Sequence, residues 1–230
     1  MAAPLESTPL FLLNTVLFPL AKIQLHVFEP RYRELIRYCL QHDCGFGIVL
    51  IREGAEVGET ADPYLVGTLV KIHSVHTYDD GHMDVQVVGE RRLRIRQLNH
   101  DRPYLVGMTE PVPEADFEPE SDPDPLDILV RMLVQEYIET HFRLLGMQVA
   151  TIKLPMDPTA LSFVVANFLQ VDDREKQVLL EISDTRERLN RTLPILEQQL
   201  QDLQHQDPLR YEGEPYRMTT SDFSDFIVPN

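Results

Sequence analysis

Tryptophan is absent from this sequence, cysteine occurs only twice, and no apolar run approaches the ~18 residues needed to cross a bilayer. Two cysteines are too few for a disulfide framework, so we expect both to be reduced. The N-terminus MAAPLESTPL lacks the basic flank and the apolar core of a signal peptide. These absences argue against a secreted or membrane-spanning protein and predict a cytoplasmic one.

The common motifs of nucleotide binding and hydrolysis are also missing. No glycine is followed by lysine, which excludes the phosphate loop G-x-x-x-x-G-K-[ST]. No histidine is followed by glutamate and no serine lies in G-x-S-x-G spacing, so two hydrolase signatures are excluded. Cys39, His42 and Cys44 lie close together, but their spacing matches no zinc signature and a fourth ligand is missing. We therefore expect no catalytic residue, no metal and no cofactor, and a protein that is not an enzyme.

Positive charge is scarce, with 21 Lys and Arg against 37 Asp and Glu and a net charge of −16. An acidic chain repels polyphosphate at long range, which argues against nucleic acid and against an anionic membrane surface as partners. The hydrophobic content of 43% is enough to bury a core without disulfides. Composition thus predicts an ordinary globular protein and argues against nucleic acid as its main partner.

Residues 9–112 have the pattern of several short strands and one helix. Pro30 suits the first turn of that helix, which we expect to end before Gly45. Asp-Gly at Asp80 and Gly81 predicts a tight hairpin turn, which places His76 opposite the following strand, with Asp84 as a candidate cross-strand partner. Residues 82–88 and 91–98 are predicted as two separate strands. The set suggests a small, twisted, partly closed barrel.

The second half of the sequence is helical. Residues 113–125 combine prolines with acidic residues and are predicted to be a linker. Residues 126–206 have four helical patterns and are predicted to form a helical bundle, whereas residues 207–230 are interpreted as a tail. The last helical pattern carries a leucine seam, which could pack inside the bundle or form a dimeric coiled coil, so the oligomeric state stays open; the seam consists of Leu189, Leu193, Leu196, Leu200 and Leu203.

The opening run PLFLLNTVLFPLAKIQLHVFEPRY, residues 9–32, resembles the start of the N-terminal domain of Lon proteases. The order and spacing of further segments extend the resemblance to roughly residues 9–200. These segments are the run VGTLVKI at 66–72, the turn at 79–81, the run VVGERRLRI at 87–95, and, more faintly, LPMDPTALSFVVA and EKQVLLEISDTRERL.

The resemblance implies an α+β protein in which a small PUA-like β-barrel with one helix precedes an α-helical bundle. Lon N-terminal domains recognise substrates and do no chemistry, so it also implies a non-catalytic module that binds unfolded or degron-like segments or partner proteins. Full-length Lon proteases continue with an ATPase module and a Ser-Lys protease domain, and we expect neither in this chain. Stand-alone proteins of this kind occur in bacteria, and vertebrate cereblon contains a related domain.

Phe28, Arg31 and Tyr32 form a dense aromatic and charged group at the start of the predicted helix. One hypothesis is an exposed surface that contacts protein segments. The alternative is structural: Phe28 packs against the helix start, and Glu29 pairs with Arg31 or Arg33. A concave surface where the two halves meet is the predicted place for recognition.

The stretch from Arg91 to residue 96 alternates, so that Leu93 and Ile95 share one face. Arg92, Arg94 and Arg96 occupy the other face, which predicts a solvated outer surface neutralised by acidic residues. The same stripe could contact phosphates, since PUA-like barrels also occur in RNA-binding proteins. An RNA-binding protein is therefore one alternative, and a small hydrolase without a known signature is another.

Overall fold

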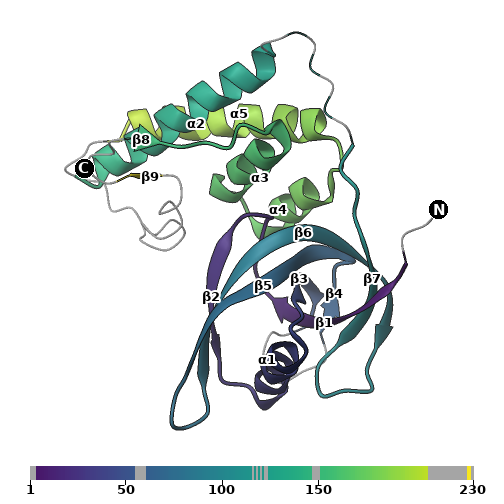
Figure 1. Ribbon diagram of the computed structural model, residues 1–230. Helices are drawn as coiled ribbons and strands as arrows, with labels where there is room; N and C mark the ends of the chain where they lie inside the picture. The colour runs from purple at the N-terminus through teal and green to yellow at the C-terminus, as the bar shows by residue number, and fades with distance from the viewer. Residues whose placement is uncertain are drawn as a thin grey trace. The chain divides into compact units, whose positions relative to one another are not determined.

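The computed structural model describes residues 4–54, 61–115, 117, 119, 121, 124–146, 151–206 and 227–228 (Figure 1). Its contacts divide the chain into two compact units. The first unit consists of Met1–Pro113 and Asp173–Glu181, and the second consists of Glu114–Asp172 and Ile182–Asn230. The segment Asp173–Glu181 thus clusters with the β-rich unit, although it lies inside the 126–206 stretch that the sequence pattern assigns to the bundle.

The first unit is a mixed sheet with helices, as the sequence pattern predicts. Strand β1 pairs with β7, then β6, β5 and β3 follow, and β1 also pairs with β3 in parallel, so the pairings form a closed circuit. Strand β4 extends the sheet beyond β3, and β2 pairs with β6. The elements are β1 (Glu6–Leu13), β2 (Lys22–Val27), α1 (Pro30–His42), β3 (Phe46–Glu53), β4 (Asp62–Pro63), β5 (Val66–Thr77), β6 (Met83–Asn99), β7 (Val106–Pro111) and α4 (Asp173–Glu181).

The predicted hairpin and first helix are both confirmed. Strands β5 and β6 are antiparallel and are joined by a turn in which Gly81 has a φ of +84°, a value that glycine tolerates best. The Tyr78 N–H donates to the His82 carbonyl over 2.9 Å and closes the turn. Helix α1 begins with Pro30, and its apolar side, which includes Leu35 and Cys39, is buried.

Residues 82–88 and 91–98 form one continuous strand, β6, rather than the two strands predicted. The glycine between them does not end the strand. Gly89 donates a backbone hydrogen bond to the Ala21 carbonyl and accepts one from Leu20 N–H, both over 2.9 Å. A Cβ at Gly89 would lie 2.4 Å from the Phe18 carbonyl oxygen, so glycine is required there for close approach of two backbones.

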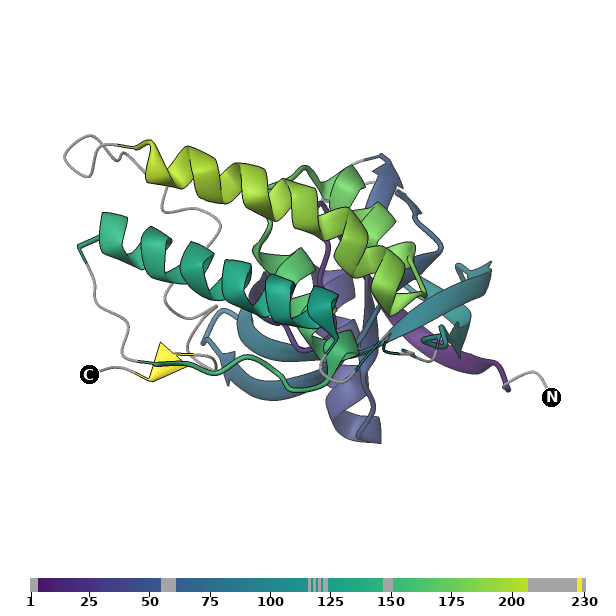
Figure 2. The ribbon, with the colours of Figure 1, turned by 90° about the horizontal axis from the view of Figure 1, so that it is seen from above.

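The second unit contains helices and one short strand pair. Aspartate side chains accept hydrogen bonds from the first-turn amides of α2, α3 and α5, which explains where these helices start. Figure 2 shows α2 and α5 running side by side. The elements are α2 (Pro125–Leu144), β8 (Thr151–Ile152), α3 (Pro158–Phe168), α5 (Thr185–Gln204) and β9 (Ile227–Val228).

The leucine seam of α5 packs inside the second unit, which was the first of its two predicted interpretations. Leu189, Leu196 and Leu200 are buried within the single chain. The helix continues through Pro194 to Gln204. Within the described part of the chain, no helix combines the length and the apolar composition that a membrane crossing requires.

Arg188 is a buried charge of the second unit, with 0% of its residue surface exposed. Its guanidinium donates to Ser162 Oγ over 2.8 Å and to Glu114 Oε2 over 3.1 Å, and also to the Ile182 carbonyl. The same group lies 4.0 Å from the centroid of the Phe163 ring. Because its charge is paired and its donors are used, Arg188 can stay buried in this unit.

Candidate functional site

A pocket of about 240 Å³ in the first unit runs along strand β2. One wall is formed by residues 23–29 without interruption. Side chains of a strand alternate between two faces, so a pocket that touches successive residues lies along the strand's edge. The opposite wall is formed by Phe11 and Leu13 of β1, by Thr15, and by Tyr32 of α1. We call this pocket the β2 groove.

The β2 groove has an apolar floor and an exposed aromatic ring at its end. Leu25 and Val27 are buried in the same core cluster as Phe11 and Leu13. Phe28, which follows the strand, keeps 45% of its surface exposed. An exposed phenylalanine beside an apolar hollow gives a partner two apolar surfaces at once.

The three residues singled out in the sequence take different positions. Phe28 and Tyr32 both line the β2 groove, whereas Arg31 lines a second pocket of about 200 Å³. Tyr32 is only 4% exposed, because its ring stacks on Phe11 with centroids 3.9 Å apart and its hydroxyl accepts a hydrogen bond from Leu12 N–H over 3.3 Å. Tyr32 is therefore a wall of the groove and part of the core, and Phe28 is the exposed member.

The predicted pairing of Glu29 with a neighbouring arginine is confirmed. Arg31 Nε donates to Glu29 Oε2 over 3.0 Å. The Arg31 guanidinium also lies 4.5 Å from the centroid of the Tyr32 ring, within the range of a cation–π contact. The carboxylate at this end of the groove is thus neutralised within the chain.

A cluster of exposed rings beside Phe28 was missed in the sequence. His26 on β2 and His82 after the hairpin turn have centroids 5.7 Å apart, and Phe28 lies 6.4 Å from His82. Tyr78 contacts the ring of His76 edge-on at 4.6 Å. We call these five residues the ring cluster. They come from segments about 50 residues apart in the sequence, so only the strand register brings them together, and that register was not predicted for β2.

Asp84 holds the ring cluster together. His26 Nδ1 lies 2.7 Å from Asp84 Oδ1, and the Tyr78 hydroxyl donates to Asp84 Oδ2 over 2.8 Å. The hydrogen bond from His26, followed by that from Tyr78, lowers the pKa of Asp84, and the same carboxylate raises the pKa of Tyr78. His76 faces Asp84 in the β5–β6 register as predicted, but the carboxylate is engaged by His26 and Tyr78 instead.

The arginine stripe does not form the solvated surface that was predicted. Arg92 is 1% exposed, and it donates to the Leu180 carbonyl over 2.8 Å and to the Pro113 carbonyl over 3.3 Å. The prediction for Arg92 is wrong because α4 packs in this unit, and carbonyls in the last turn of a helix attract a cation. Arg94 is half-buried, and Arg96 is exposed and pairs with Glu110.

The thiols of Cys39 and Cys44 interact with each other, whereas His42 Nδ1 lies 2.8 Å from the Tyr38 carbonyl oxygen. Cys39 is buried, and its thiol lies 3.7 Å from the Gly45 carbonyl oxygen, whereas Cys44 is exposed. Burial raises the pKa of Cys39, so its thiol stays protonated and behaves as a small core group. Across the residues that the structure describes, no group of three or more His, Cys, Asp or Glu side chains is placed to hold a metal ion.

Comparison with known proteins decides the family. The family model of the ATP-dependent protease La (LON) substrate-binding domain matches residues 7–198. The chain belongs to this family. The Lon resemblance of the opening run is thereby confirmed, and it extends over most of the sequence. The mixed fold with a β-rich N-terminal part agrees with solved members of the family.

Curated Lon proteases match more than four-fifths of this chain. Lon protease 1 of Thermus thermophilus is 32% identical over 204 residues, which cover 84% of this chain and 24% of that protease. Lon protease 2 of Syntrophobacter fumaroxidans is 29% identical over 193 residues, covering 83% of this chain and 24% of that protease. The chain thus spans about a quarter of the length of these curated relatives.

Two solved structures show the same fold. The crystal structure of a Lon N-terminal domain protein from Xanthomonas campestris is 28% identical and superposes with a TM-score of 0.61, covering 82% of this chain and 98% of that one. The N-terminal domain of the Mycobacterium avium complex Lon protease has a TM-score of 0.61 at 19% identity, covering 84% and 98% of the two chains. This second likeness concerns the fold alone.

Proposed function

We propose that this chain is a recognition module that binds exposed apolar segments of other proteins and does no chemistry on them. The observation that carries the proposal is the β2 groove, an apolar hollow with Phe28 exposed at its end, in a chain of the Lon substrate-binding domain family. Unfolded chains and degron-like tails expose the apolar side chains that such a hollow can bury, whereas folded proteins keep most of them inside.

The size of the groove sets the expected affinity. At about 240 Å³ it is smaller than the ~300–1,000 Å³ of typical small-molecule pockets, so it suits one or two side chains of a larger partner. Full burial of an apolar side chain contributes roughly 1.5–3 kcal/mol. A few such anchors, less the cost of ordering the bound segment, give a dissociation constant on the order of micromolar.

The two alternative functions have less support. Phosphate binding by the arginine stripe is weakened by the burial of Arg92 and the pairing of Arg96, in a chain with a net charge of −16. A hydrolase needs a group whose pKa suits proton transfer near neutral pH. Asp84 of the ring cluster does not meet this need, because the hydrogen bonds of its neighbours lower its pKa further away from that range.

We further infer that the first unit is a small barrel of the PUA-like type and that the helices of the second unit form a bundle. The closed circuit of strand pairings and the buried seam of α5 support this description. The domain boundaries at residues 112 and 126, and action on proteins of the cytoplasm, remain part of the proposal.

Replacing Phe28 by serine tests the function. The probe is a reduced and alkylated protein that cannot fold, compared with its native form, and the affinity is measured by calorimetry. We expect the unfolded form to bind the wild-type chain more tightly than the native form does, and Phe28→Ser to weaken that binding about tenfold, as expected for an anchor residue.

Leu65→Ser is the matched control, because Leu65 is 55% exposed in the same unit but does not line the β2 groove. It should leave the affinity within about twofold, as is usual for contacts away from an anchor. Equal binding of the native and unfolded forms would contradict the proposal, and so would equal losses from the two variants. Circular dichroism checks that both variants stay folded.

A further inference from the structure

Strand β2 has one edge without a strand partner in the described part of the chain. Its six residues pair with β6 from Lys22 opposite Val88 to Val27 opposite Met83. No second strand pairs with it among the described residues. In an antiparallel pair, alternate residues turn their N–H and C=O groups away from the partner strand. Those outward groups of β2 therefore face the side on which the groove lies.

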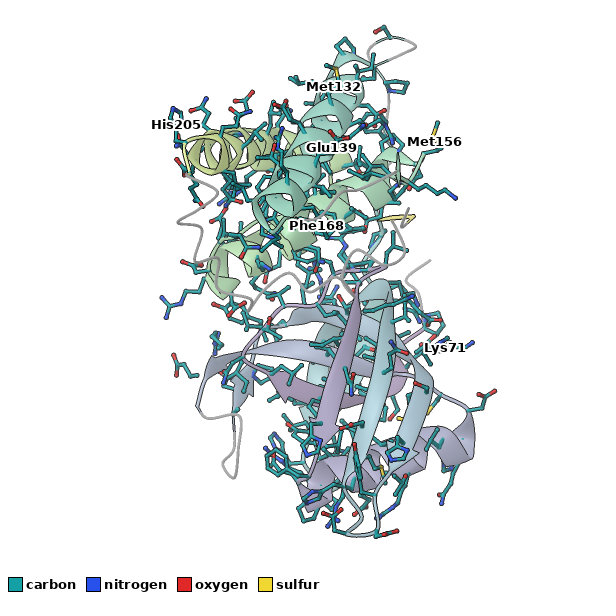
Figure 3. All side chains as sticks on the ribbon, turned by 90° about the vertical axis from the view of Figure 1, so that its left-hand side faces the viewer. Lys71, Met132, Glu139, Met156, Phe168 and His205 are labelled. Atoms are coloured by element: carbon teal, nitrogen blue, oxygen red, sulfur yellow. The ribbon has the colours of Figure 1, made fainter. Side chains whose placement is uncertain are left out.

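This edge lacks the features that proteins use to block strand addition. Blocked edges are short or carry proline or several charges. Strand β4, another edge of the sheet, fits that description, because it consists only of Asp62 and Pro63. Strand β2 is three times as long, has no proline, and carries one permanent charge, at Lys22. In Figure 1 β2 lies on the left flank of the first unit, and Figure 3 turns that flank toward the viewer.

The walls of the β2 groove favour a neutral, extended and partly apolar occupant. Its lining includes the aromatic and apolar side chains of Phe11, Leu13 and Tyr32, which are buried, and the exposed side chains of His26 and Phe28, which belong to the ring cluster. The acid that lines the groove, Glu29, pairs with Arg31, and Asp84 of the ring cluster is engaged by His26 and Tyr78. A cationic occupant would therefore have to compete with groups of this chain for these two carboxylates.

We propose that the β2 groove binds an extended protein segment, which adds to the free edge of β2 as a further strand and places apolar side chains at alternate positions against the groove. This inference rests on the proposed function and specifies its substrate class. A bound helix would satisfy its own backbone groups and leave the edge of β2 unpaired, whereas an added strand uses both the backbone edge and the apolar walls. Apolar segments of high strand propensity should thus bind better than helical ones of equal hydrophobicity.

N-methylation of a peptide's backbone amides tests directly whether the peptide binds as a strand added to β2. The probe is a neutral eight-residue peptide that alternates valine and threonine, prepared unmodified and in two N-methylated forms. One form carries methyl groups on the odd amides and the other on the even amides. A strand added to β2 donates through only one of these two sets, because the other set faces away.

We expect the unmodified peptide to bind. Relative to it, one methylated form should lose at least tenfold in affinity, because each lost backbone hydrogen bond to an aligned acceptor weakens binding. The affinity of the other methylated form should stay within about threefold of that of the unmodified peptide. Hydrogen exchange supplies a second readout on the protein. On addition of the unmodified peptide, alternate amides of Lys22–Val27 should gain protection, while the amides of β4 should not.

Equal losses from the two methylated forms, or no loss from either, would overturn strand addition. If the amides of β2 gain no protection from hydrogen exchange on addition of the peptide, strand addition is overturned as well. If the unmodified peptide fails to bind while the unfolded protein still binds in a Phe28-dependent manner, this inference fails and the proposed function stands. If the unfolded protein also fails to bind, the proposed function fails with it.

Discussion

Asp84 receives hydrogen bonds from His26 of β2 and from Tyr78 beside the hairpin turn, so one carboxylate joins three segments of the first unit. These bonds require the ionised form, which is why the pKa of Asp84 is lowered. Because the folded pKa lies below the unfolded one, the stabilisation is present above the ordinary pKa of an aspartate, ~3.9, and is lost as the pH falls through the lowered value. The hydrogen bonds beside the β2 groove should therefore weaken as the pH falls through the lowered pKa of Asp84.

Replacing His26 by alanine should raise the pKa of Asp84 toward its ordinary value, because the hydrogen bond from His26 is the largest cause of the shift. Carboxyl NMR titration of the wild type and the variant measures this change. Tyr78→Phe removes the second cause and should raise the same pKa by less. An unchanged Asp84 pKa in His26→Ala would show that the ring cluster is not organised in this way.

At the residue scale, an interaction between near neighbours in the chain is easier to predict from the sequence than the burial of a side chain is. Glu29 and Arg31 are near neighbours in the chain, so their ion pair could be predicted. Arg92 could not be placed correctly, because strand periodicity shows which face a side chain occupies but not which distant element covers that face. Arg92 is covered by packing that involves α4, some 80 residues further along the chain.

At the scale of elements, Gly89 determines the length of β6. The pattern on either side of it is typical of two strands, and a glycine between two strand patterns fits a turn as well as a close backbone approach. The contact with Phe18 is formed by a segment about 70 residues away, so the sequence alone could not decide between them. The start of α1 was easier to predict, because its signal, Pro30 in the first turn, is local.

Gly89→Ala should destabilise the first unit by about 3 kcal/mol, since its Cβ would meet a backbone oxygen that cannot move aside cheaply. Gly81→Ala is the matched control in the same unit. Its Cβ would meet only the end of the Arg33 side chain, so the positive φ should cost about 1 kcal/mol. Urea unfolding followed through amide resonances of the first unit measures both changes. Equal losses of stability in the two variants would contradict the close backbone approach at Gly89.

At the scale of the whole molecule, each of the two units buries one arginine that binds backbone carbonyls. In the first unit Arg92 binds the carbonyls of Pro113 and Leu180, and in the second Arg188 binds the Glu114 carboxylate and the Ile182 carbonyl. The division of the sequence into a β half and a helical half could be predicted from the change of period. The sequence could not predict that α4 clusters with the β-rich unit, because an amphipathic pattern does not show which element covers its apolar face.

The family follows from both the sequence and the comparisons, but the site does not. The run around Phe28 was predicted as a candidate surface, and the structure adds the groove, the free edge of β2 and the ring cluster beside it. All three depend on strand pairing between segments far apart in the sequence, which a single sequence does not reveal.

The most direct test of the account compares an unfolded polypeptide with single-stranded RNA as ligands of the intact chain at low and at physiological salt. Apolar burial is insensitive to moderate salt, so we expect binding of the unfolded polypeptide to change by less than about threefold, with no comparable RNA binding. Phe28→Ser should weaken binding of the unfolded polypeptide, and the double variant Arg94→Ser, Arg96→Ser should not. Tight RNA binding that falls by orders of magnitude with salt and disappears with Arg94 and Arg96, without any binding of the unfolded polypeptide, would contradict the account.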